Sequence, residues 1–145
     1  MSGEPLNLGF ADADDLGIVS ALVQDAVVKT ADLVYLGRMK RFALVANRFC
    51  WEAEGKAFRR RCGLHFDTVR TVRAKGIDRT AVEQVLELLA VDAREHENGV
   101  TIDLVFAGDA HLRLEAEAVE GGLKDLSEPW PTKRAPRHDV DGESA

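Results

Sequence analysis

Two tight-turn signals, each followed by alternating apolar residues, constrain the fold of this chain more than any other feature. Asn98-Gly99 is typical of a two-residue hairpin turn, because both residue types tolerate a positive φ. Gly108-Asp109 is a second turn signal. The apolar residues that follow the turns recur at every second position: Val100, Ile102, Leu104 and Phe106, then Ala110, Leu112, Leu114 and Ala116. The pattern predicts a three-stranded antiparallel meander over residues 85–116.

The segment before the first turn fits two periods. Val82, Val85, Leu86 and Leu89 have helical spacing, whereas residues 89–93 alternate as in a strand. Because a strand that follows a tight turn needs a partner before that turn, we predict a strand over residues 85–95 rather than a helix.

Further strands are expected upstream. Residues 31–36 and Arg41–Phe49 are short runs rich in Val, Leu, Tyr and Phe, and a glycine lies in their connection, which predicts a hairpin. Arg41–Phe49 is apolar on both faces and is therefore expected to be a central strand. Phe58–Phe66 and residues 68–75 read either as two strands or as one long strand bent near Asp67.

Two helices are expected to flank the strands. Residues 12–28 have apolar side chains at helical spacing after three aspartates suited to the start of a helix. Residues 118–126 return to helical spacing through Val119, Leu123 and Leu126. Gly121-Gly122 would cost this second helix about 1 kcal/mol per glycine relative to alanine.

The expected fold class is therefore α+β, with about seven antiparallel strands in a bent sheet or partly open barrel between an N-terminal and a C-terminal helix. This order of elements resembles the pleckstrin-homology-like superfold, in which the last helix plugs one end of a barrel. A general α+β sheet-and-helix domain is the alternative. With 145 residues, the chain is expected to form a single domain over 1–130, followed by an irregular or disordered tail over 131–145.

Composition excludes several classes of protein. The longest stretch without a charged residue is nine residues (16–24), which is too short to span a bilayer. Two cysteines, Cys50 and Cys62, are too few for a disulfide scaffold or a four-cysteine zinc site, and we expect them to be unbonded in a cytoplasmic protein. The N-terminus has no apolar signal segment. We therefore expect a cytoplasmic location and no membrane insertion.

The sequence contains no recognisable catalytic motif. It has no phosphate-binding loop, no dinucleotide fingerprint and no nucleophile elbow. His65 and Asp67 could share one face of a strand, but no third metal ligand lies at a telling spacing. We expect no catalytic residue, no metal and no cofactor, and hence no enzymatic activity.

Charge is divided unevenly along the chain. Residues 38–79 carry a net charge of +8 and residues 80–128 carry −9, within a total of −6. This division indicates either an anionic partner for the basic segment or complementary charges on adjacent strands of one sheet. The candidate anion-binding residues lie in the first hairpin connection and at the start of the third strand: Arg38, Lys40, Arg41, Arg59, Arg60 and Arg61.

Several strings are similar to a family of small bacterial proteins catalogued as domain of unknown function 2948. They are LVQDAV at 22–27, RFALVANRF at 41–49, RRRCGLHF at 59–66, Phe106-Ala107-Gly108 and the ending Trp130…Lys133-Arg134…Pro136. The resemblance implies a bacterial, cytoplasmic, single-domain protein, and it brings no activity, cofactor or catalytic residue.

The leading hypothesis is a non-enzymatic interaction or regulatory module that binds a protein partner through its sheet edge or barrel rim. The alternative is a binder of anionic ligands, such as RNA, the ribosome surface or a phosphorylated metabolite, through the basic cluster. The sequence leaves the partner and the oligomeric state open.

Overall fold

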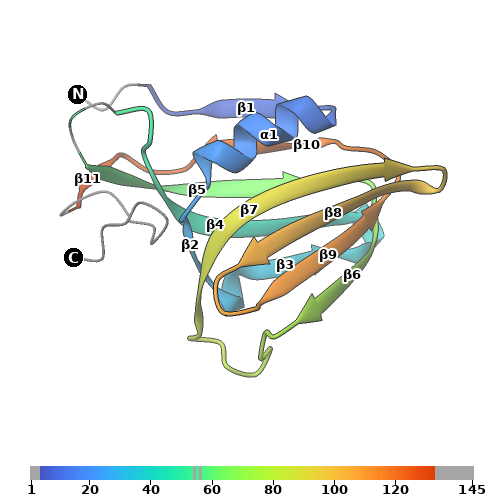
Figure 1. Ribbon diagram of the computed structural model, residues 1–145. Helices are drawn as coiled ribbons and strands as arrows, with labels where there is room; N and C mark the ends of the chain where they lie inside the picture. The colour runs from blue at the N-terminus through green and yellow to red at the C-terminus, as the bar shows by residue number, and fades with distance from the viewer. Residues whose placement is uncertain (1–3, 54, 56, 133–145) are drawn as a thin grey trace, which may run out of the picture.

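The computed structural model describes residues 4–53, 55 and 57–132, and it is dominated by one antiparallel sheet (Figure 1). The elements are β1 (Asn7–Phe10), α1 (Ala13–Leu22), β2 (Val27–Lys29), η1 (Thr30–Asp32), β3 (Leu33–Leu36), η2 (Gly37–Met39), β4 (Arg41–Phe49), β5 (Phe58–Phe66), β6 (Val69–Lys75), β7 (Val85–His96), β8 (Gly99–Phe106), β9 (His111–Ala116), β10 (Gly121–Asp125) and β11 (Trp130–Pro131). Neighbouring strands follow the order β1-β10-β5-β4-β2-β7-β8-β9-β6, with β3 beside β4 and β11 beside β5.

The sheet bends back on itself, so that β7, β8 and β9 lie in front of β4 and β5 in Figure 1. The helix α1 contacts β7 and β1 and buries Leu16 and Val19 in the same core. The terminal strands of the order, β1 and β6, pair only with β10 and β9, so the sheet is open. Inward side chains from both arms of the bend form the core, among them Phe42, Leu44, Leu64, Phe66, Ile102, Leu104, Leu112 and Leu114.

The predicted meander is confirmed, with one shift at its first turn. Strand β7 pairs with β8, and β8 pairs with β9, along their lengths. His96 pairs with Gly99, so the two turn residues are Glu97 and Asn98 rather than Asn98 and Gly99. Gly99 has a φ of 130°, and the carbonyl oxygen of Ala116 occupies the position that a Cβ would need. Glycine is therefore required there for close strand approach.

The predicted β3–β4 hairpin and the central position of β4 are also confirmed, because β4 is paired on both sides, by β5 and by β3 and β2. Of the two interpretations for residues 58–75, two separate strands are correct. Thr68, with a φ of 59°, turns the chain between β5 and β6, and β6 leaves β5 to pair with β9.

The N-terminal helix is confirmed but is shorter than predicted. Asp12 caps it, and its side chain accepts a hydrogen bond of 2.8 Å from the backbone N–H of Asp15. The helix ends at Leu22, and residues 27–29 instead form β2, which inserts between β4 and β7. Apolar residues at 26–28 suit either a helix or a buried strand, so periodicity alone did not separate the two.

The predicted C-terminal helix over residues 118–126 is wrong. Residues 121–125 form β10, which runs between β1 and β5. A Cβ at Gly121 would collide with the carbonyl oxygen of His65 and the ring of Phe10, so the glycine allows β10 to fit between its neighbours. The alternation of β10 is hard to recognise, because its inward positions are Gly121, Leu123 and Asp125, and only one of them is apolar.

The expected fold class is therefore wrong in its architecture. The protein has one α-helix among its described residues, eleven strands instead of about seven, and an open sheet without the C-terminal helix that a pleckstrin-homology-like barrel requires. Most of the predicted tail, residues 133–145, lies outside the described residues. No helix in the described part of the chain has the length and apolar character needed to cross a membrane.

Candidate functional site

The six predicted anion-binding residues do not form one patch. Strands β4 and β5 are antiparallel and pair Phe42 with Phe66 and Phe49 with Arg59. Arg41 therefore lies at one end of the pair and Arg59 at the other. Arg61 pairs with Asn47, which is six residues along β4 from Arg41, so the two positions are about 20 Å apart at 3.3 Å per residue. This exceeds the Debye length of about 8–10 Å, so the two groups of cations do not reinforce each other.

Three of these cations are paired with carboxylates from distant parts of the chain. Two contacts lie at one end of β4: Lys40 Nζ is 3.1 Å from Glu117 Oε2, and Arg41 Nε is 2.7 Å from Asp67 Oδ1. At the other end, Arg60 Nη1 is 3.4 Å from Asp125 Oδ2.

The remaining three differ in their surroundings. Arg59 donates to the carbonyl oxygen of Asn47 at 3.0 Å and lies over the ring of Phe49, and burial lowers its pKa. Arg38 and Arg61 form no ion pair with any residue that the structure describes. The cluster is therefore divided in space, and half of its cations are paired with carboxylates.

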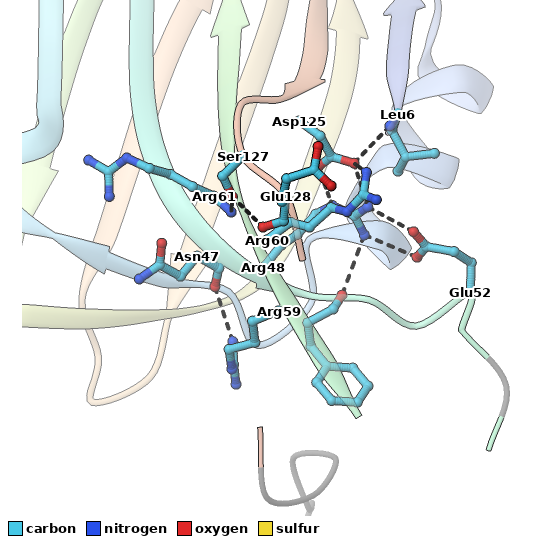
Figure 2. A network of polar contacts seen from close by, with 11 residues as sticks. Leu6, Asn47, Arg48, Glu52, Arg59, Arg60, Arg61, Asp125, Ser127 and Glu128 are labelled. Carbon is cyan, nitrogen blue, oxygen red and sulfur yellow. Dashed lines mark hydrogen bonds and ion pairs between the residues drawn. The ribbon is translucent and has the colours of Figure 1, made fainter. Parts of the chain in front are cut away.

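The most enclosed charged group is one that the sequence analysis missed. Arg48 of β4 is fully buried and lies between two carboxylates (Figure 2). It donates to Asp125 from Nε at 2.8 Å and from Nη2 at 2.9 Å. It also donates to both carboxylate oxygens of Glu52, at 3.0 and 2.8 Å. Asp125 further accepts the backbone N–H of Leu6 at 2.7 Å.

This buried network joins β4, β10, the loop after β4 and the N-terminal segment. Burial disfavours the charged carboxylates, but the hydrogen bonds from Arg48 outweigh it and lower the pKa of both Asp125 and Glu52. Burial alone would lower the pKa of Arg48, but its hydrogen bonds with Asp125 and Glu52 outweigh burial and raise it. Because the donors of Arg48 are turned onto protein carboxylates, the network stabilises the fold and is not available to a ligand.

His65 and Asp67 do lie together on the outer face, as their spacing suggested. His65 Nε2 is 3.6 Å from Asp67 Oδ2, and the other oxygen of that carboxylate is held by Arg41. No group of three or more potential metal ligands occurs among the residues that the structure describes. The geometry is that of a partly exposed surface contact.

A groove lies between β3 and β6. Its volume is about 460 Å³. At one end the hydroxyl of Tyr35, on β3, lies 2.7 Å from the carbonyl oxygen of Val69 and 3.0 Å from that of Arg70, both on β6. Most of the lining side chains are apolar, but about half of the surface of the groove is polar; the lining residues are Thr30, Ala31, Leu33, Tyr35, Phe42, Val72, Ala74, Ile77, Arg79 and Leu112.

The groove is bordered by strand edges that the sheet does not use. Strand β3 pairs with β4 alone, and β6 pairs with β9 alone. Val34 and Leu36 expose 43% and 41% of their surface on the face of β3 opposite to Leu33 and Tyr35, which line the groove. On β6, Arg73 and Lys75 are exposed. Alternating cations are typical of an edge strand and were the sequence signal for this edge.

Comparison with known proteins identifies the family. A family model described as protein of unknown function (DUF2948) matches residues 6–138. The chain belongs to this family. The matched segment includes every helix and strand of the structure, and thus both the groove of this DUF2948 protein and its Arg48 network. No curated protein and no solved structure matches the chain.

Proposed function

We propose that this DUF2948 protein is a non-enzymatic interaction module that binds an extended segment of a protein partner as an additional strand along β6. The observation that carries this proposal is the groove beside β6, whose edge has no neighbouring strand over residues 72–75. An edge strand offers a row of backbone donors and acceptors, and an extended peptide can pair with them while its side chains enter neighbouring pockets.

The dimensions and chemistry of the groove support this mode of binding. A volume of about 460 Å³ lies within the range of about 300–1,000 Å³ that is usual for ligand sites, and most of the side chains that line it are apolar. The β6 residues from Val72 to Lys75 extend for about 13 Å, which is the length of four residues in an added strand. Val72 and Ala74 face the groove, so alternate side chains of the partner would face it as well.

Binding of anionic ligands through the basic cluster is less well supported, because its cations are separated and half of them are paired. The two cysteines are buried free thiols, which suits the reducing bacterial cytoplasm that we propose as the location.

The proposal is tested by selecting binders from a displayed library of random 12-residue peptides. The protein is compared with two tryptophan variants on β6. Ala74→Trp fills the groove, because Ala74 is exposed and lines it. Thr71→Trp is the matched control, since Thr71 pairs with outward-facing Glu115 and lies on the other face of the same strand.

We expect selected peptides to slow backbone hydrogen exchange in β6 and to bind Thr71→Trp as they bind the unaltered protein. Affinity for Ala74→Trp should fall at least tenfold. The proposal is wrong if no peptide is enriched, if the enriched peptides protect other segments, or if Ala74→Trp binds them with unchanged affinity.

A further inference from the structure

Two cations of strand β6, Arg73 and Lys75, lie directly opposite β9 residues that are not acidic. Arg73 lies directly opposite Arg113 of β9, a like-charge cross-strand pair, which is an unfavourable arrangement. Arg113 is itself turned toward β8, where its Nε donates to Asp103 Oδ1 at 2.8 Å. Arg73 therefore faces a cation whose carboxylate partner lies one strand further away.

The next pair along β6 repeats this arrangement. Lys75 lies opposite His111, and the Nε2 atom of His111 is 2.8 Å from the same oxygen of Asp103. The carboxylate of Asp103 therefore interacts with both Arg113 and His111. Burial alone would raise the pKa of Asp103, but the hydrogen bonds from these two residues outweigh burial and lower it. Neither Arg73 nor Lys75 forms an ion pair within the described part of the chain.

A strand added to the open edge of β6 would stand directly beside these two cations. Arg73 and Lys75 point to the outer face, whereas Val72 and Ala74 face the groove, because their β9 partners Leu114 and Leu112 are buried. Side chains of an added strand alternate in the same way, so its outward residues become cross-strand neighbours of the two cations. Its inward residues meet the groove.

We infer, on the basis of the proposed strand addition, that the partner segment alternates acidic and apolar residues, with its acidic side chains against Arg73 and Lys75 and its apolar side chains in the groove. The acidic residues supply the opposite charge that Arg113 and His111, the β9 residues directly opposite the two cations, do not supply. We expect β6 to select partner segments by the alternation of charge over about four residues, because residues 72–75 are the part of β6 that borders the groove.

The inference is tested with three synthetic peptides of equal length, whose central residues alternate valine with glutamate, glutamine or lysine. Their affinities are measured for the unaltered protein and for Arg73→Glu/Lys75→Glu. This double variant is expected to fold, because the carboxylate introduced by Arg73→Glu would form an opposite-charge pair with Arg113. The control is Arg94→Glu, a reversal of an exposed cation on the outer face of β7, three strands from the groove.

The glutamate peptide should bind the unaltered protein about three- to tenfold more tightly than the glutamine peptide, since an exposed ion pair is worth only a few-fold in affinity. The lysine peptide should bind most weakly. The order should reverse for Arg73→Glu/Lys75→Glu and stay unchanged for Arg94→Glu.

Two outcomes overturn the inference, and they can be told apart. If all three peptides protect β6 from exchange with equal affinity, strand addition stands and the charge pattern is wrong. If none binds and the random library also yields no β6 binder, the proposed function is wrong as well, and the cations of β6 only keep copies of the chain from pairing edge to edge.

Discussion

Replacing Asp125 with asparagine removes the charge on which the buried network depends while keeping the side-chain shape. Asp125 is fully buried and accepts hydrogen bonds from Arg48, Arg60 and the backbone of Leu6. The substituted side chain would place an amide nitrogen, a donor, next to guanidinium donors and would leave Arg48 with Glu52 as its only carboxylate. Breaking a buried ion pair by removing one partner costs about 3–5 kcal/mol. We therefore expect the free energy of unfolding to fall by about that amount.

The measurement is guanidinium unfolding together with the melting temperature. A chain of this size loses roughly 2–4 °C per kcal/mol, so Asp125→Asn should melt roughly 6–20 °C lower. The matched control is Asp103→Asn, which breaks contacts with Arg113 and His111 on a partly exposed face and should cost about 1 kcal/mol or less. If the two variants lose equal stability, the Asp125 network does not have the role assigned to it.

Acid unfolding provides a second measurement on the same variant. The pKa of Asp125 is lowered in the folded state, so its ionisation stabilises the fold fully above the unfolded pKa of about 3.9. That stability is lost as the pH falls below this value toward the folded pKa. The unaltered protein should therefore lose stability more steeply than Asp125→Asn below about pH 4. Parallel pH profiles would contradict the assignment.

Three further outcomes are expected. Gly121→Ala should cost about 1–3 kcal/mol in chemical denaturation, because the added methyl group meets the carbonyl oxygen of His65; an unchanged midpoint would refute this close approach. Cys50 and Cys62 are buried free thiols, and burial raises the pKa of Cys62 to about 12, so mass spectrometry should find both unlabelled by an alkylating reagent until the protein unfolds. Tyr35→Phe removes the hydroxyl contacts with β6, so hydrogen exchange in β6 should become faster and the free energy of unfolding should fall by about 0.5–1.5 kcal/mol. Unchanged exchange would contradict the role of Tyr35 as a bridge between β3 and β6.

The elements that the sequence predicted correctly are those whose information is local. The meander β7-β8-β9 follows from alternation and from two turn signals, and each strand pairs with its neighbour in the chain. The same holds for the β3–β4 hairpin. Asp12 at the start of α1 is likewise a local signal.

The elements that the sequence did not predict depend on partners far away in the chain. Strand β10 is defined by β1 and β5, more than a hundred and more than fifty residues before it. Its inward positions hold Gly121, which makes room for Phe10, and Asp125, which is buried only because Arg48 is there to pair with it. Neither residue resembles the apolar side chain that an alternation search looks for, so helical spacing was the better local fit.

The charge division along the chain has a structural explanation that also singles out β6. Basic residues of the 38–79 segment are neutralised where the fold brings them against acidic residues of the later segment, as Lys40 meets Glu117 and as Arg48 of β4 meets Asp125 of β10 on the far side of β5. A strand inside a sheet has two neighbours that can supply such a partner, whereas an edge strand has one. Strand β6 has only β9, and β9 presents Arg113 to Arg73. The charge on Arg73 and Lys75 therefore stays uncompensated at an edge where another chain can supply a carboxylate.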